Sequence, residues 1–164
     1  MNSMGNVHGG VIMSLLDVAL CTAARTLHPE SVGVITINMT TSFIQHLRIH
    51  TDELGKGTAR LSVPLEANLM NSMGNVHGGV IMSLLDVALC TAARTLHPES
   101  VGVITINLTT SFIGAGGGAK LYADARVLKD GRSMSFVEGE AKNEDGSLVA
   151  KAVATVRVMH KEKQ

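Results

Sequence analysis

The feature that most limits the fold is a helix candidate that is apolar on nearly every side. It runs from Val80 to Leu89 and follows a glycine-rich turn, Asn-Ser-Met-Gly-Asn-Val-His-Gly-Gly, at residues 71–79. A helix of this composition is normally buried, because it has no polar face to present to water. One carboxylate, Asp86, lies inside the apolar run, and a buried acid needs a hydrogen-bonding partner or a chemical role. The fold must therefore enclose this helix and provide for Asp86.

The same segment occurs twice in the chain. Residues 1–44 repeat residues 70–113 with one difference, Met39 in place of Leu108. Solenoid proteins need about three or more units to bury a continuous core, so two copies do not indicate a repeat fold. Residues 45–69 and 114–164 occur once, which excludes duplication of a whole domain. We interpret residues 1–44 as a duplicated helix–strand segment, of recent or engineered origin, that is appended to or swapped onto one domain of residues 45–164.

The composition indicates a globular protein. Hydrophobic residues make up 45% and charged residues 17% of the chain, which excludes a disordered protein. Fourteen basic and fourteen acidic side chains cancel, so neither nucleic acid nor a membrane surface is an expected partner. Cys21 and Cys90 are equivalent residues inside the apolar segment, which fits reduced thiols. The first apolar run lacks a preceding basic region and contains Asp17, so we expect a soluble, cytoplasmic protein without a signal peptide.

Alternating apolar and polar residues predict five strands in addition to the helix. The helix is expected over about residues 78–96, ended by His97-Pro98. One strand precedes it and four follow, joined by short loops. This order predicts an α+β fold, with an antiparallel five-stranded sheet against one long buried helix. The expected strands cover about residues 57–67, 104–112, 120–127, 133–142 and 148–158.

Four features of these strands are also predicted. Pro64 indicates that the first strand lies at the edge of the sheet. In the strand after the helix, alternation places Thr105 on the face opposite Ile104 and Leu108. The last strand carries alanines along one face, and we expect this small face to pack against the helix. Asp130-Gly131 predicts a hairpin turn.

The motif Asn-x-x-Gly-x-Val-His-Gly-Gly, followed seven residues later by Asp, resembles that of the hotdog-fold acyl-CoA thioesterases of the phenylacetate (PaaI-like) family. The resemblance covers about residues 45–164 and includes the strand order. The stretch Val-Leu-Lys-Asp-Gly-Arg-Ser at residues 127–133 resembles the hairpin of that family, which ends in Gly-Arg. One departure is the glycine-rich run at residues 114–118, where relatives often have proline. A strand follows this run, so we expect a flexible loop and not a phosphate cradle.

The resemblance implies hydrolysis of the thioester between coenzyme A and an acyl group, in a homodimer or tetramer. No cofactor is implied, because coenzyme A is part of the substrate. Asp86 is the implied nucleophile or general base, the Gly78 N–H the oxyanion donor, and Asn71 the residue that places the nucleophile or water. Thr105 stands where the family often has Ser or Thr early in the strand after the helix.

The residues themselves fit this chemistry, although each has a plainer interpretation. A helix start offers unpaired N–H groups to an oxyanion, and Gly78 and Gly79 allow close approach; alternatively, the glycines only permit a tight turn. Asp86 has the ionisable group that a base requires; alternatively, neighbouring hydroxyls satisfy a buried acid. His77 fits a substrate- or backbone-orienting role better than that of a base.

Other candidate groups concern the coenzyme. Lys129 and Arg132, with Ser133 beside them, are suited to the phosphates of coenzyme A; as solvated charges at strand ends they would need no function. No His, Cys or acidic cluster has metal-ligand spacing, and there is no Ser nucleophile elbow.

One distance indicates how the site is assembled. Gly78 and Asp86 are eight residues apart, about 12 Å along a helix, whereas reacting groups must come within roughly 3 to 3.5 Å. One helix cannot supply both groups, but two antiparallel helices related by a two-fold axis can. We therefore expect a site shared between subunits.

The first copy carries equivalents of four of the candidate residues: Asn2, Gly9, Asp17 and Thr36. We favour an appended or swapped segment over a second working site. A hotdog protein that binds acyl-CoA without hydrolysing it, and an engineered duplication with incidental activity, are the alternatives.

Overall fold

A computed structural model gives the structure of the protein and describes residues 47–160. The chain divides into two compact units, Met1–Arg48 and Ile49–Gln164, and the account below concerns the second. The predictions for Asn2, Gly9, Asp17 and Thr36 lie outside the described residues.

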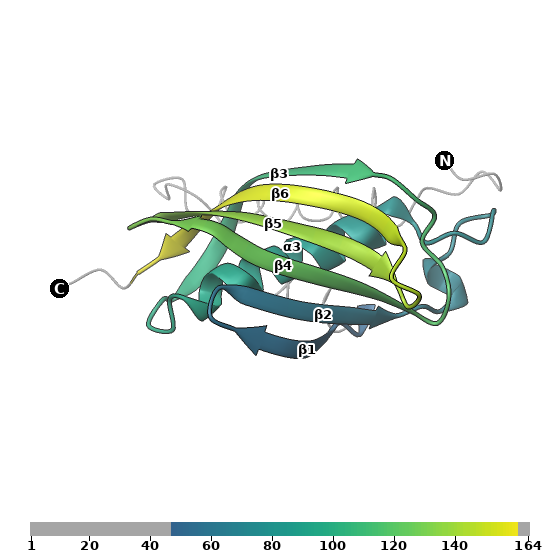
Figure 1. Ribbon diagram of the computed structural model, residues 1–164, viewed down its shortest axis with the longest axis horizontal. Coiled ribbons are helices and arrows are strands. Elements are labelled where there is room, and N and C mark those ends of the chain that lie inside the picture. Colours follow the sequence, from purple (N-terminus) through teal and green to yellow (C-terminus); the bar gives the residue numbers. More distant parts are fainter. Residues whose placement is uncertain (1–46, 161–164) are drawn as a thin grey trace, which may run out of the picture. The chain divides into compact units, whose positions relative to one another are not determined.

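The second unit is a single antiparallel sheet with one long helix against it, as predicted (Figure 1). The sheet has six strands in the order β1-β2-β4-β5-β6-β3, and the helix, α3, contacts all six. Between β2 and α3 lies a short 3-10 helix, η1. In chain order the elements are β1 His50–Gly55, β2 Thr58–Pro64, η1 Ala67–Leu69, α3 Gly78–Thr95, β3 Gly102–Phe112, β4 Lys120–Asp130, β5 Met134–Asn143 and β6 Leu148–Met159.

The prediction of five strands was wrong by one, because β1 has no alternating pattern. All six of its residues are exposed, so neither face carries an apolar signal. It pairs with β2 across a turn at Lys56 and Gly57, where Gly57 has a φ of 76°. Strand β2 is therefore an interior strand and not the predicted edge. Pro64 is tolerated there because β1 pairs only as far as Ser62, so no neighbour on that side needs its missing N–H.

A β-bulge in β3 changes which side chains face the helix. The register with β6 shifts between Thr105 and Asn107, so Ile106 is an extra residue and is 55% exposed. Thr105 and Leu108 consequently pair with Val156 and Ala154, whose side chains are both buried. The predicted alternation was wrong here: Thr105 shares the inner face with Leu108, and Ile104 lies on the outer face.

The small face predicted for the last strand extends across the sheet beneath α3. Paired positions of β2, β4, β5 and β6 carry Ala59, Ala125, Gly139 and Ala152. A Cβ at Gly139 would lie 3.2 Å from Leu89 and 3.5 Å from Leu85 of the helix. Both leucines are fully buried, so α3 sits directly on this row. The helix is long and apolar enough to cross a membrane by length and composition, a test that core helices also pass, and here it packs against the sheet.

Replacing Gly139 with valine should destabilise the fold. The added methyl groups must displace the two leucines or the Asp124 carbonyl, which lies 3.1 Å from the position of a Cβ. Overpacking of this kind costs about 1–3 kcal/mol, measured by urea denaturation. The matched control is Glu138→Val on the opposite face, where the loss of an exposed ion pair with Arg126 should cost less than about 1 kcal/mol. Equal effects of the two changes would contradict the packing described.

Candidate active site

Asp86 lies in the third turn of α3 and is hydrogen-bonded to the inward-facing threonine of β3. The hydroxyl of Thr105 donates to Oδ1 of Asp86 at 2.7 Å. Burial raises the pKa of the Asp86 carboxyl above its usual value, and the hydrogen bond from Thr105 partly opposes this rise. The bulge at Ile106 produces this contact, because unbroken alternation would turn Thr105 away from the helix. The structure therefore brings together two of the four predicted catalytic residues.

A third group belongs to the same cluster, and sequence reasoning missed it. Cys90 follows Asp86 by one helical turn, and its Sγ lies 3.2 Å from Oγ1 of Thr105. Burial, followed by the nearby Asp86 charge, raises the pKa of the Cys90 thiol to about 11, so the thiol is protonated at neutral pH. The i, i+4 spacing of Asp86 and Cys90 was the available signal, but from the sequence Cys90 indicates only reduced thiols.

The start of α3 holds the predicted oxyanion donor. His77 is the N-cap residue, and its carbonyl accepts the N–H groups of Val80 and Ile81. The N–H groups of Gly78 and Gly79 belong to the first turn, where no intrahelical acceptor exists. A Cβ at Gly78 would lie 3.3 Å from the ring of Phe112, so the absence of a side chain lets this ring sit against the helix start.

Asn71 shapes the turn that precedes the helix. Its side-chain oxygen accepts the backbone N–H groups of Met73, at 2.9 Å, and Asn75, at 3.0 Å. The Asn71 side chain therefore hydrogen-bonds within its own turn, and its predicted role in placing a nucleophile stays a prediction.

The glycine-rich run after β3 supports the same turn. The N–H of Val76 donates to the Gly116 carbonyl at 2.8 Å, and the Gly117 N–H donates to Asn143. A Cβ at Gly116 would lie 3.1 Å from Val76, so glycine permits the close approach. These contacts explain the glycines better than the predicted flexible loop, and a bulkier residue at Gly116 would displace the turn.

The residues predicted to meet coenzyme A lie near the other end of α3. Lys129, Arg132 and Ser133 are exposed in or beside the β4–β5 hairpin, which Asp130 and Gly131 begin as predicted. Nε2 of His97, just beyond the helix, lies 2.8 Å from Oδ1 of Asp130. Because α3 has 18 residues, its two ends are about 27 Å apart. Within one chain, the hairpin is thus remote from Gly78.

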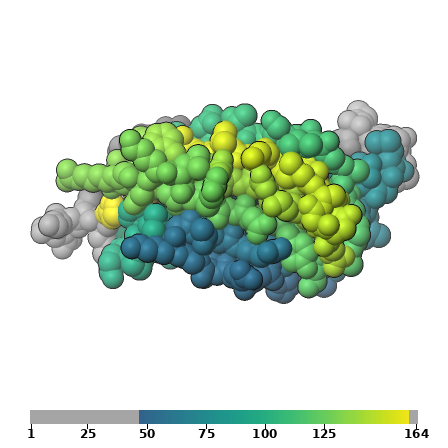
Figure 2. Space-filling model, in the orientation of Figure 1, coloured from purple at the N-terminus to yellow at the C-terminus, as the bar shows by residue number. Residues whose placement is uncertain are grey.

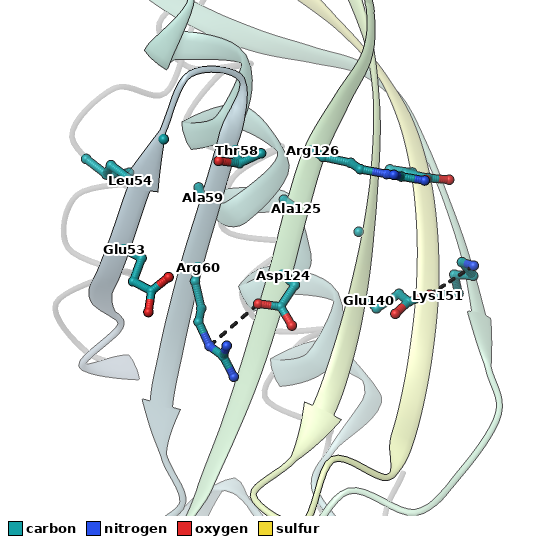
Figure 3. A pocket seen from close by; sticks show the side chains of 13 residues that line it. Glu53, Leu54, Thr58, Ala59, Arg60, Asp124, Ala125, Arg126, Glu140 and Lys151 are labelled. Atoms are coloured by element: carbon teal, nitrogen blue, oxygen red, sulfur yellow. Dashed lines mark hydrogen bonds and ion pairs between the residues drawn. The ribbon is translucent and has the colours of Figure 1, made fainter.

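A hollow of about 490 Å³ lies elsewhere, on the outer face of the sheet (Figures 2 and 3). Six of its seven charged side chains form ion pairs with one another: Arg60 with Asp124 at 3.5 Å, Lys151 with Glu140 at 2.9 Å, and Arg126 with Glu138. Hydrogen bonds from Lys142 and Lys151 lower the pKa of Glu140 to about 2. None of the predicted site residues within 47–160 lines this hollow, and its ion pairs indicate a solvated sheet surface, not the reaction centre.

Comparison with known proteins agrees with this fold and with the motif. The family model of the thioesterase superfamily matches residues 4–54 and 73–150. The chain belongs to the thioesterase superfamily. The two matched stretches begin at Met4 and Met73, which are equivalent positions of the repeated segment.

Individual proteins also resemble the chain over half of its length or more. A protein of Saccharolobus solfataricus named "Putative esterase" is 30% identical over 109 residues, covering 66% of this chain and 77% of its own. A Salmonella typhimurium protein named as a medium/long-chain acyl-CoA thioesterase is 30% identical over 96 residues, 51% of this chain and 62% of its own. The Escherichia coli PaaI protein shares the fold with a TM-score of 0.67 at 22% identity, over 72% of this chain and 84% of its own.

The pKa of Asp86 gives the stability of the protein a dependence on pH. Burial raises the pKa of Asp86 in the native state above its unfolded value of 3.8, so the native state binds the proton more tightly. The free energy of unfolding therefore falls as pH rises from the unfolded pKa to the native pKa. Asp86→Asn removes this cost and should raise the melting temperature at pH 7, and the gain should shrink as pH falls through the native pKa of Asp86 and be gone below the unfolded value of 3.8. Thermal melts over this pH range test it.

Asp124→Asn is the control for this measurement. Asp124 lies on the outer face, where it pairs with Arg60 and Lys142, and its neutralisation should bring no gain at pH 7. A melting temperature of Asp86→Asn that stays at or below the wild-type value across the whole range would contradict the buried, destabilising carboxylate.

Proposed function

We propose that the protein hydrolyses acyl-CoA thioesters to a free acid and coenzyme A, with Asp86 as nucleophile or general base. The observation that carries the proposal is the Asp86–Thr105 hydrogen bond within a thioesterase-superfamily chain. The Salmonella relative named as an acyl-CoA thioesterase supports coenzyme A as the leaving group. A carboxylate whose pKa is raised by burial is a stronger base than one in water, which suits proton abstraction.

Both chemical routes use the same groups. As a base, Asp86 takes a proton from water while the water oxygen attacks the thioester carbonyl. As a nucleophile, its Oδ2 attacks the carbonyl and water then hydrolyses the mixed anhydride. In either route the C–S bond breaks, coenzyme A leaves as a thiolate that takes up a proton, and negative charge develops on the carbonyl oxygen. N–H groups at a helix start stabilise that charge.

The oxyanion donor for Asp86 comes from a second subunit in this proposal. Helix α3 begins at Gly78, so its own first N–H groups lie about 12 Å from Asp86 along the axis. In an antiparallel pair that sets Gly78 of one helix beside Asp86 of the other, the two-fold axis passes residue 82, midway between them. Met82 is 39% exposed, as a residue that meets its own copy across such an axis would be.

The β4–β5 hairpin is then the place for the nucleotide of coenzyme A. It lies beyond the C-terminal end of α3, on the side of Asp86 that the partner helix start approaches. Lys129 and Arg132 are exposed there and have charge opposite to the coenzyme phosphates. His77, Gly79 and Ser133 complete the substrate-binding residues in this proposal.

Asp86→Asn should abolish most of the thioesterase activity. Loss of a general base lowers kcat by about 10² to 10⁴, and thiol release from short, long and aromatic acyl-CoAs measures it. Asp17→Asn, the equivalent change in the first copy, is the matched control and should keep activity. Loss of turnover with Asp17→Asn alone would assign the reaction to the first copy. A wild-type protein that binds acyl-CoA but releases no thiol would be a binding protein.

Mixing two inactive variants tests whether the site is shared. Asp86→Asn lacks the base, and Gly78→Val blocks the helix start, since even a Cβ there would press on Phe112. A mixed dimer contains one intact site, built from Asp86 of one chain and Gly78 of the other, and one doubly defective site. Unfolding and refolding the two together should therefore recover about a quarter of wild-type activity.

The control for this experiment is each variant refolded alone. Neither should regain turnover, and both should give the wild-type mass by light scattering. A mixture as inactive as its components would mean that base and oxyanion donor belong to one chain.

A further inference from the structure

We propose that Cys90 is a positioning residue that orients Thr105 toward Asp86, which deepens the function proposed above and rests on it. The inference comes from a chain of three side chains: Cys90 Sγ lies 3.2 Å from Thr105 Oγ1, which donates to Asp86 at 2.7 Å. All three residues are half-buried, so water competes less for these contacts than it would on the open surface.

The number of protons on each group determines the direction of the hydrogen bonds between Cys90, Thr105 and Asp86. A threonine hydroxyl has one proton, and Thr105 uses it on the Asp86 carboxylate. Thr105 can therefore only accept from Cys90, so the thiol is the donor. Its pKa of about 11 keeps the thiol protonated at the pH at which Asp86 is ionised.

The geometry favours a positioning role over mere filling of space. Asp86 and Cys90 stand on one side of α3, four residues apart, and Thr105 on β3 lies against both. With a donor on one side and an acceptor on the other, the hydroxyl has one satisfied orientation. An alanine at position 90 would leave the acceptor capacity of Thr105 unused and free its rotation.

The consequence for the reaction falls on Asp86. A Thr105 hydroxyl held toward the carboxylate stabilises the ionised form and opposes the effect of burial on the pKa. Loss of the thiol donor weakens that hydrogen bond, since linked hydrogen bonds strengthen one another. The pKa of Asp86 should then rise, and the base should be less well aligned. Substrate binding should not change, because Cys90 acts through Thr105.

The experiment compares Cys90→Ala with Cys90→Ser in the full chain. For Cys90→Ala we expect kcat to fall about 3- to 10-fold, the scale of one neutral hydrogen bond, with KM unchanged and the acid limb of the kcat–pH profile moved to higher pH. Cys90→Ser restores a donor and should recover most of kcat and the wild-type profile. Cys21→Ala, the equivalent change in the first copy, should have no effect.

A double-mutant comparison separates positioning from packing. In a Thr105→Val background, Cys90→Ala should have no further effect on kcat, because the residue through which it acts is gone. The proposal is overturned if Cys90→Ala keeps the wild-type profile, if Cys90→Ser is as impaired as Cys90→Ala, or if the two losses simply multiply.

Failure of the proposed function gives a different result. If the wild-type protein hydrolyses no acyl-CoA, the function fails, and the positioning role is tested by the pH dependence of the stability gain from Asp86→Asn. That dependence should move to higher pH in the Cys90→Ala background, and an unmoved dependence would overturn the role of Cys90.

Discussion

The rest of the structure depends on the packing of α3 against the sheet, whose side chains are small where the helix crosses it. Ala59, Ala125, Gly139 and Ala152 leave room for Leu85 and Leu89, so the helix lies close to the strands. With this side of α3 taken up by packing, the half-buried residues form a stripe on another side, at the three- and four-residue spacing of Ser83, Asp86 and Cys90. The position of the carboxylate is therefore a consequence of how the other side of α3 packs in the core.

One extra residue in β3 brings a hydroxyl group to this stripe of half-buried residues. Ile106 interrupts the alternation, and the strand before it turns its other face to the helix. Thr105 thereby meets Asp86, and its oxygen also lies within reach of Cys90. Bulges often redirect a side chain at functional sites. Here the bulge exposes an isoleucine, and it supplies the buried acid with the hydrogen bond it requires.

The elements that could be predicted from the sequence are those with a regular pattern of apolar and polar residues. The helix was expected over about 78–96 and spans Gly78–Thr95, because its apolar run is long and His97-Pro98 ends it. Strand β1 could not be found, since all its residues are exposed. The bulge could not be found either, because an inserted residue is visible only in the pairing with β6. Asp86 was identified as the acid of the apolar helix and through the family motif, and Thr105 through its place early in the next strand, whereas only its contacts single out Cys90.

The position of Thr105 on an edge strand bears on how a site could be completed. Strand β3 is the last in the sheet order, so one of its sides carries backbone groups with no neighbouring strand among residues 47–160. The Asp86 cluster lies under this edge, where a second helix can approach without disturbing the packed side of α3.

A helix that brings its own glycine start has the same sequence whether it comes from another subunit or from residues 1–44. The repeated segment, however, lacks residues 114–164, whose strands bury α3 in the described domain, so the helix predicted for that segment has no sheet of its own to cover. A helix from a complete subunit arrives with its own sheet, and this favours the subunit as the donor of the oxyanion N–H groups in the proposed shared site.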